Sequence, residues 1–245
     1  MLCKKKIYVL FFAASLLLCL YAASFCRLAR WQNAPVCVAD IFCMITTPRE
    51  YLYLIYLVFG LMQYGDCRFY LMPAYTLKAK SRRNIVKHQI CHAIQGALGL
   101  AAWIAATAAA ISVFVAEEAI NWDQYESLYY LNTQTLRHES LGTVIVLSVV
   151  YIFFTLIVVA LLFAISAWLV SSAWVGGLSF TLLYLWDTAQ SYDHSMFFRR
   201  FSLQYDSWST NTPRLTVLVV HPLVVLLLIS SVYVLSKKKD LIKSC

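Results

Sequence analysis

The stretch that decides the fold covers residues 141–190 and reads LGTVIVLSVVYIFFTLIVVALLFAISAWLVSSAWVGGLSFTLLYLWDTAQ, with Asp187 as its single charged residue. A single helix over these 50 residues would be about 75 Å long. The hydrocarbon layer of a bilayer is only about 30 Å thick. We therefore expect the run to fold back once, at Ser171-Ser172, and to form two spans over 142–170 and 173–190.

Four further apolar runs flank this stretch, and none shows the alternation of a membrane β-strand. Because only helices and closed barrels satisfy the backbone in lipid, we predict an all-α fold. The chain is expected to be one polytopic integral membrane domain over 1–245. With 61% hydrophobic residues and a mean hydropathy of +0.69, a water-soluble protein is excluded. The further spans are expected near 7–26, 51–70, 90–116 and 215–235, giving about six transmembrane helices.

The amino-terminal run follows Lys4, Lys5 and Lys6 and resembles the start of a signal peptide, with a candidate cleavage site at Ala22-Ala23-Ser24. The run has about 20 apolar residues, which is longer than the hydrophobic region of a signal peptide. We expect an uncleaved first span.

The distribution of charge predicts the orientation of these spans. Of the 20 Lys and Arg residues, 13 lie in the amino end, the stretch from Arg68 to Lys87 and the tail, whereas ten of the 12 acidic residues lie in the alternate loops. By the positive-inside rule the basic side faces the cytoplasm, which places both termini there. The net charge of +8 lies beside the spans, so we expect a multi-pass cell-membrane protein in contact with lipid and no nucleic-acid partner.

The eight cysteines contain no CxxC pair, so neither a metal ribbon nor a redox motif is indicated, and we expect no metal and no cofactor. Cys26, Cys37 and Cys43 flank one probable outer loop, where a disulfide is an open alternative. Aromatic residues at span ends are expected to act as interfacial anchors: Trp31, Trp122, Trp168, Trp174 and Trp208.

The most basic stretch of the chain carries Lys78, Lys80, Arg82, Arg83 and Lys87. Positive charge that only sets topology would explain it. The alternative is a docking surface on a short basic amphipathic helix, bounded by Pro73, for a cytoplasmic partner.

The string LIYLVFGLMQYGDCRFYLMPAYTLKAKSRRNIVKHQI, residues 54–90, resembles the region between the second and third spans of ABC-2-type permeases. These are membrane subunits of ATP-binding-cassette exporters. Asp66 matches an acidic residue that often ends the second span, and Ser81-Arg82-Arg83 matches a basic element of the following loop. The tail SKKKDLI, residues 236–242, is similar to the closing cluster of that family. The chain departs from many members because only six residues precede its first span, without an interfacial helix.

The resemblance implies a transporter subunit rather than an enzyme. It would form a homodimer or a heterodimer with a second permease, and a separate cytoplasmic ABC ATPase would drive it and dock on the basic stretch. The chain has no GxxxxGK[ST] nucleotide-binding pattern. The resemblance also implies that the segment after the fifth span turns back into the membrane. Asp66 and Asp187 are candidate pathway or gating residues, although Asp187 could simply end its helix and meet water, which we favour.

Two other classes of function are alternatives to a transporter subunit. An intramembrane protease could pair Ser179 with His221, but helix geometry predicts a separation in depth of roughly 15 Å. Glu117-Glu118 and the histidines His88 and His92 resemble elements of a membrane metalloprotease, yet about 25 residues of one helix separate them. A non-transport assembly or immunity factor, which would bind its partner through the acidic and aromatic outer loop 117–140, is the main alternative.

Overall fold

The computed structural model describes residues 4–47, 50–72, 75, 81–170, 172–190, 194–195, 197–199, 202–210 and 212–238. The chain is 79% helical, and its described part contains no strand, apart from an isolated bridge between Cys37 and Glu118. The predicted all-α class is therefore confirmed.

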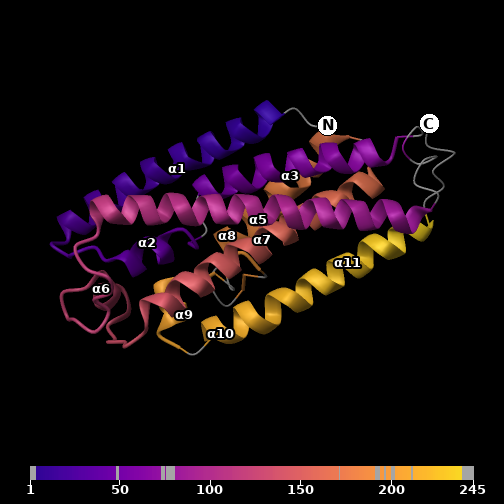
Figure 1. Ribbon diagram of the computed structural model, residues 1–245. Coiled ribbons are helices and arrows are strands. Elements are labelled where there is room, and N and C mark those ends of the chain that lie inside the picture. Colours follow the sequence, from indigo (N-terminus) through magenta and orange to yellow (C-terminus); the bar gives the residue numbers. More distant parts are fainter. Residues whose placement is uncertain are drawn as a thin grey trace.

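Six long helices run side by side (Figure 1). Their bounds are α1 Lys4–Trp31, α3 Glu50–Tyr70, α5 Arg82–Val115, α7 Leu141–Leu169, α8 Ala173–Ala189 and α11 His221–Lys238. A π-helical turn over Thr216–Val220 leads directly into α11, just before Pro222, whose ring cannot follow regular helical hydrogen bonding. Four short helices also lie in the described residues: α2 Val38–Met44, α6 Leu128–Thr133, α9 Tyr205–Trp208 and α10 Thr212–Leu215.

Each predicted span overlaps one of the long helices, and a break separates α7 from α8 where the fold-back was predicted. Helix α7 ends at Leu169, Val170 has an extended backbone (φ −127°, ψ 142°), and α8 starts at Ala173. Helix α5 begins at Arg82, before the predicted start of the third span at residue 90. The reason is an N-cap: the Ser81 hydroxyl accepts the Asn84 backbone N–H at 3.2 Å and starts the helix two turns earlier.

Four of the helices are long and apolar enough to cross a membrane: Val9–Trp31, Arg82–Val115, Leu141–Leu169 and Thr216–Lys237. Helix α8 has only 17 residues, which agrees with the short fifth element expected from the sequence. Helix α3 is continuous, but polar residues such as Gln63 and Asp66 interrupt its apolar sequence.

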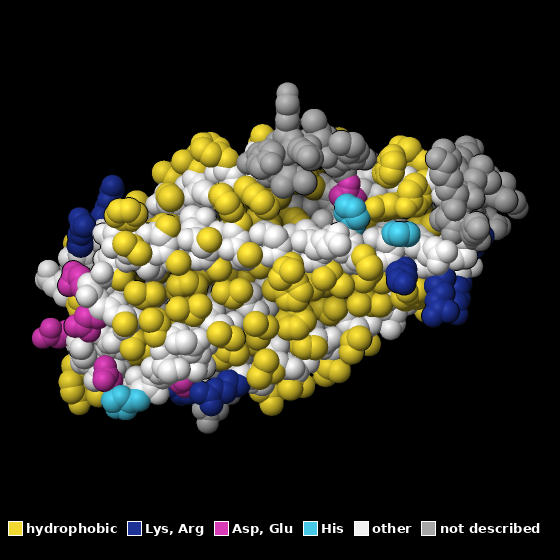
Figure 2. All heavy atoms as spheres, viewed as in Figure 1, with side chains coloured by type: hydrophobic (Ala, Val, Ile, Leu, Met, Phe, Trp, Pro, Cys, Tyr) yellow, Lys and Arg dark blue, Asp and Glu magenta, His cyan; other side chains and the backbone are white. Residues whose placement is uncertain are grey.

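Helix α7 forms the centre of the bundle. Sixteen of its 29 residues are buried, on all sides of the helix, whereas α8 buries only five of 17. The surrounding helices instead turn large apolar side chains outward, and Phe12, Leu178 and Leu227 are each more than 60% exposed. Figure 2 shows the result as a broad hydrophobic belt over the middle of one face, with most of the charged side chains towards the two ends. Such a surface is compatible with a lipid environment.

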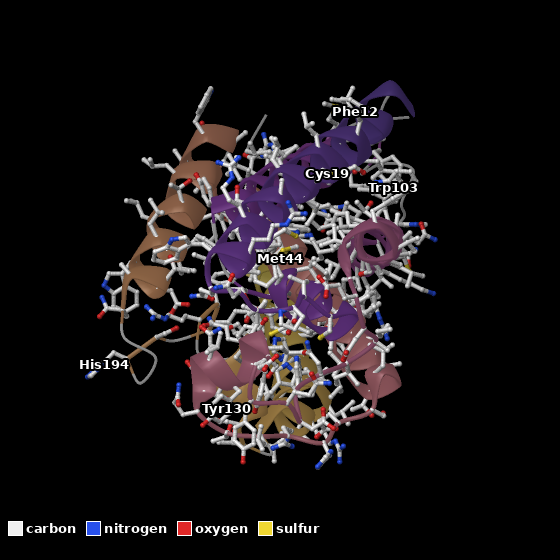
Figure 3. All side chains as sticks on the ribbon, turned by 90° about the vertical axis from the view of Figure 1, so that its left-hand side faces the viewer. Phe12, Cys19, Met44, Trp103, Tyr130 and His194 are labelled. Atoms are coloured by element: carbon white, nitrogen blue, oxygen red, sulfur yellow. The ribbon has the colours of Figure 1, made fainter. Side chains whose placement is uncertain are left out.

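The two ends of the bundle differ in construction. One end, which we call the basic end, is where α1 and α5 begin and α11 ends (Figure 1). The other, which we call the cap end, carries α2, α6 and α9. Figure 3 looks onto the cap end, with Met44 of α2 near the centre and Phe12 of α1 at the periphery. Trp103 of α5 lies beside α1, and its indole N–H donates to the Ser15 hydroxyl at 2.8 Å.

Candidate functional site

The basic end brings two of the predicted docking residues to the surface. Arg83 and Lys87 are exposed on the first two turns of α5, whereas Lys78 and Lys80 lie outside the described residues. Arg82, Arg83 and Lys87 all belong to the long helix α5, which continues beyond the short helix expected for the docking surface. A helix of 34 residues is about 51 Å long, so α5 extends well beyond the roughly 30 Å hydrocarbon layer.

The Arg82 side chain contacts the end of another helix, α11. Its guanidinium Nη1 donates to the carbonyl oxygens of Ser236 at 3.3 Å and Lys237 at 3.2 Å. These carbonyls belong to the last turn of α11, where the helix dipole leaves partial negative charge that a cation stabilises. Arg82 therefore ties the start of α5 to the end of α11.

A buried amide connects the same part of α5 to two more helices. Gln89 is 3% exposed. Its Nε2 donates to the Cys67 carbonyl of α3 at 3.2 Å, and its Oε1 accepts the Trp168 indole N–H of α7 at 3.0 Å. The side chain of Gln89 thus joins the start of α5 to α3 and to the central helix. The sequence analysis missed Gln89; a lone Gln in a span facing a Trp residue is the type of signal that could have identified it.

Asp187 is buried, so the expectation that it meets water at the end of its helix is wrong. It is 1% exposed, and its carboxylate accepts hydrogen bonds from the segment that follows α8. The Ser195 hydroxyl donates at 3.1 Å, the Phe197 backbone N–H at 3.1 Å and the Arg199 N–H at 3.4 Å, and the Phe198 N–H donates as well. Successive backbone N–H groups that converge on one anion form a nest, and here the anion is part of the protein.

The segment after α8 consequently turns back along the bundle. The Phe198 ring lies 4.9 Å from Tyr184 and 6.0 Å from Phe180, between ring centroids, on α8. Phe180 precedes the end of α8 at Ala189 by nine residues, or about 13 Å of helix. The adjacent Phe197 contacts the ring of His221 at 5.3 Å. The segment therefore connects α8 to the start of α11 at the depth of buried side chains.

The cap end is organised by Asp40, which the sequence analysis also missed. Asp40 of α2 is fully buried. Its carboxylate accepts the Cys37 backbone N–H at 3.0 Å, the Trp122 indole N–H at 2.9 Å and the Tyr205 hydroxyl at 3.0 Å. Burial raises the pKa of Asp40 above its ordinary value, and these hydrogen bonds oppose the rise. Burial and the nearby Asp40 charge also raise the pKa values of Cys43 and Tyr205.

The structure excludes the disulfide that was left open and changes the role expected of three tryptophans. Cys26, Cys37 and Cys43 are all free thiols, so no disulfide joins any two of them. The Cys43 thiol instead donates a hydrogen bond to the Leu203 carbonyl. Three of the five expected interfacial tryptophans are core residues, because Trp122, Trp168 and Trp208 are at most 2% exposed. Only Trp31 and Trp174 are highly exposed, at 80% and 88%.

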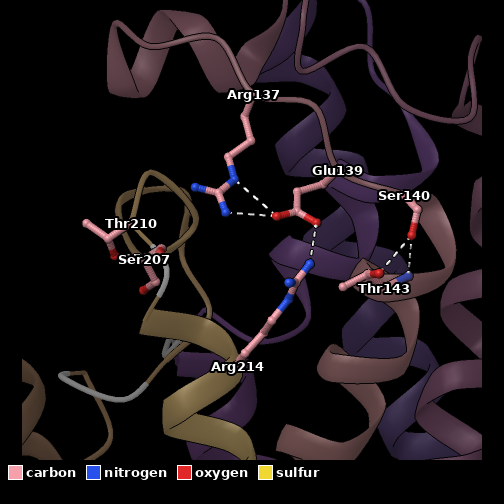
Figure 4. Close-up of polar contacts among 7 residues, drawn as sticks. All are labelled: Arg137, Glu139, Ser140, Thr143, Ser207, Thr210 and Arg214. Atoms are coloured by element: carbon pink, nitrogen blue, oxygen red, sulfur yellow. Dashed lines mark hydrogen bonds and ion pairs between the residues drawn. The ribbon is translucent and has the colours of Figure 1, made fainter.

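An ionic cluster joins the loop over residues 117–140 to the helices next to it (Figure 4). The Glu139 carboxylate lies 2.8 Å from the Arg137 guanidinium and 3.2 Å from that of Arg214 in α10. One residue further on, the Ser140 hydroxyl caps α7 by accepting the Thr143 N–H at 3.2 Å. The cluster fixes the point where α10, which leads into α11, meets the start of α7.

The residues of the protease alternatives are kept apart. Ser179 is exposed on α8 and its hydroxyl donates to the Val175 carbonyl, whereas His221 is buried against Tyr151 and Phe197. Glu117 and Glu118 follow the end of α5 at Val115, far from His88 and His92 near its start. Within the described residues, no three His, Cys, Asp or Glu side chains are grouped so that they could hold a metal ion.

Asp66, the other candidate pathway residue, is half-buried on α3 and lines a cavity between α1, α3 and α5.

The chain matches no protein family, no curated protein and no solved structure.

Proposed function

We propose that this chain is the membrane subunit of an ABC-2-type transporter, which crosses the cell membrane six times with its basic end in the cytoplasm. A separate ABC ATPase would dock on the exposed cations of α5 and drive export. Two such subunits, identical or different, would enclose the pathway.

The observation that carries the proposal is the connection between the basic end and the rest of the bundle. Arg83 and Lys87 face solvent, while Arg82 and Gln89 on the same turns hold α11, α3 and α7. A partner that moved the start of α5 would therefore move three further helices. Charge used only to set topology needs no such attachment.

The fold-back after α8 supports the same proposal. A membrane protein can accommodate irregular backbone at depth only where other groups satisfy it, and here the Asp187 carboxylate does so. The resemblance to ABC-2-type permeases implies a segment of this kind at this position.

The main alternative, an assembly or immunity factor that binds through the outer loop, has less support. The large aromatic residues of that loop are used internally: Trp122 and Tyr129 are fully buried and stack on each other at 4.7 Å. Tyr125 is the large aromatic residue of that loop that is mainly exposed, at 68%.

Docking is tested by purifying the tagged chain from its native membranes in mild detergent. We expect a nucleotide-binding subunit to co-purify and to hydrolyse ATP. The variant Arg83→Glu/Lys87→Glu should no longer recover this subunit. The matched control, Arg27→Glu/Arg30→Glu, reverses two exposed charges towards the other end of α1 and should retain the partner. Absence of an ATPase from the wild-type preparation, or equal recovery with the double reversal in α5, would count against the proposal.

Orientation is tested separately with a membrane-impermeant thiol reagent on intact cells, against the parent chain as background. Glu126→Cys, in the exposed outer loop, should react at once, and Arg83→Cys only after permeabilisation. The reverse order would place the basic end outside and exclude docking of a cytoplasmic ATPase there.

A further inference from the structure

The cavity between α1, α3 and α5 lies in the half of the bundle nearer the basic end. It has a volume of about 790 Å³, which is within the usual range for small-molecule sites. Leu10 and Phe11 of α1, Phe59 and Met62 of α3 and Leu100 of α5 form its apolar walls. In a bilayer, an apolar groove of this size between helices would be open to lipid chains.

Glycines open the groove. A Cβ atom at Gly99 would meet only the Phe11 ring, at 4.0 Å, and one at Gly65 would have nothing within 4 Å. Gly96 lies under the Gln63 side chain, whose Nε2 would be 2.7 Å from a Cβ at that position. The space is therefore created by missing side chains, and it can be filled by adding one at Gly99 without a clash against the backbone.

One side of the groove is polar. Gln63 lines the cavity, and its side chain is only 6% exposed. An amide on the wall of an apolar groove favours a ligand that can form hydrogen bonds with it. One turn further along α3 lies the Asp66 carboxylate, and His92 and Gln95 of α5 face the same cavity. Figure 2 shows an acidic group and histidines together over this part of α3 and α5.

Charge narrows the identity of the ligand. Asp66 is the only acidic residue among the described residues of the basic end, where Arg82, Arg83 and Lys87 surround the start of α5. A carboxylate on the wall of a lipid-filled groove favours a cation that can also donate hydrogen bonds. A primary ammonium group can donate to both the Asp66 carboxylate and the Gln63 carbonyl, whereas a quaternary ammonium group cannot.

We propose that this groove is a binding site for a membrane lipid whose headgroup carries a protonated primary amine, with phosphatidylethanolamine as the representative. The ammonium group contacts Asp66 and Gln63, and one acyl chain lies along Phe11, Phe59 and Leu100. The site does not depend on the proposed transport function, since it requires only that the bundle is embedded in a bilayer.

The test is native mass spectrometry of the purified chain in detergent, titrated with phosphatidylethanolamine, phosphatidylcholine or phosphatidylglycerol of identical acyl chains. Wild-type protein is expected to bind phosphatidylethanolamine about tenfold more tightly than the other two lipids. Gly99→Leu fills the groove and should weaken this binding about tenfold, while Asp66→Asn and Gln63→Leu should abolish the preference for the primary amine.

Matched controls come from positions outside the groove. Gly142→Leu adds the same side chain at a glycine with nothing within 4 Å, and Asp123→Asn removes an exposed carboxylate of the outer loop; both should bind as wild type does. Thermal unfolding of every variant reports folding, and Gly65→Leu replaces Gly99→Leu if the latter does not fold. Equal binding of the three lipids by the wild type, or undiminished binding by the groove-filled variant, would overturn the proposal.

Discussion

The carboxylate of Asp187 on α8 accepts the backbone N–H of Phe198, eleven residues later, and this contact holds the segment after α8 against the bundle. The same carboxylate accepts the N–H of Phe197 and the hydroxyl of Ser195. One buried side chain thus replaces the missing helical partners of a stretch of irregular backbone.

Replacing Asp187 should release this segment. In Asp187→Ala, several buried N–H donors lose their acceptor, and we expect a loss of about 3 kcal/mol in the free energy of unfolding. Asp187→Asn keeps one acceptor oxygen and should lose less. The measurements are thermal unfolding in detergent and the reactivity of a cysteine introduced at Ser195, which should rise in the Ala variant. The exposed Asp123→Ala serves as the control, and an Ala variant at Asp187 as stable as this control would contradict the role.

Asp40 should make the stability of the protein depend on pH. Burial raises its pKa above the ordinary value of 3.8, so the folded state holds its proton at a pH where the unfolded chain has lost it. The stabilising contribution is complete below about pH 3.8 and is lost as the pH rises through the folded-state pKa. We expect the unfolding temperature to fall over this interval in the wild type, and the fall to be smaller in Asp40→Asn. Parallel pH profiles for the two proteins would show that Asp40 does not titrate in this way.

Much of this architecture can be predicted from the pattern of apolar residues. The fold-back at Ser171-Ser172 follows from the length of the apolar run, which is too long for one span. The buried polar network could not be predicted in the same way. Asp40 and Gln89 acquire their roles from partners more than 20 residues away, Trp122 and Cys67, and hydropathy does not identify such pairs.

The same argument explains why some expectations were wrong. A Trp at the end of an apolar run is equally compatible with an interfacial anchor and with a core residue under a cap, and Trp122 and Trp208 took the second role. Whether an acidic residue near a helix end meets water depends on what folds over it, and for Asp187 that is the segment containing Phe197 and Phe198.

Gln89 should be required for the attachment of α5 to α3 and α7. Gln89→Met keeps the volume but leaves the Trp168 indole N–H and the Cys67 carbonyl without this partner, which should cost about 1–3 kcal/mol of unfolding free energy. Gln95→Met, at an exposed position on the same helix, should change stability by less than about 0.5 kcal/mol. Denaturant titration followed by Trp fluorescence compares the two variants. Equal stability of both would mean that the amide makes no net contribution.

Gly60 should be the position of α3 that tolerates a side chain least. A Cβ atom there would lie 2.2 Å from the Phe163 ring of the central helix, closer than any packed contact, so either the ring or the helix must move. We expect Gly60→Ala to cost about 1–3 kcal/mol of unfolding free energy, measured by thermal unfolding in detergent. Gly142→Ala, with no atom within 4 Å of its Cβ, is the matched control and should be near neutral.

The cause of that loss can be separated from a general effect of alanine on α3. Phe163→Leu shortens the side chain that opposes Gly60, and alone it should destabilise the protein because it leaves a cavity in the core. In the double variant the added methyl group occupies part of that cavity, so the combined loss should be smaller than the sum of the two single losses. Additive losses would show that Gly60 and Phe163 do not share a contact, and that α3 and α7 pack by another arrangement.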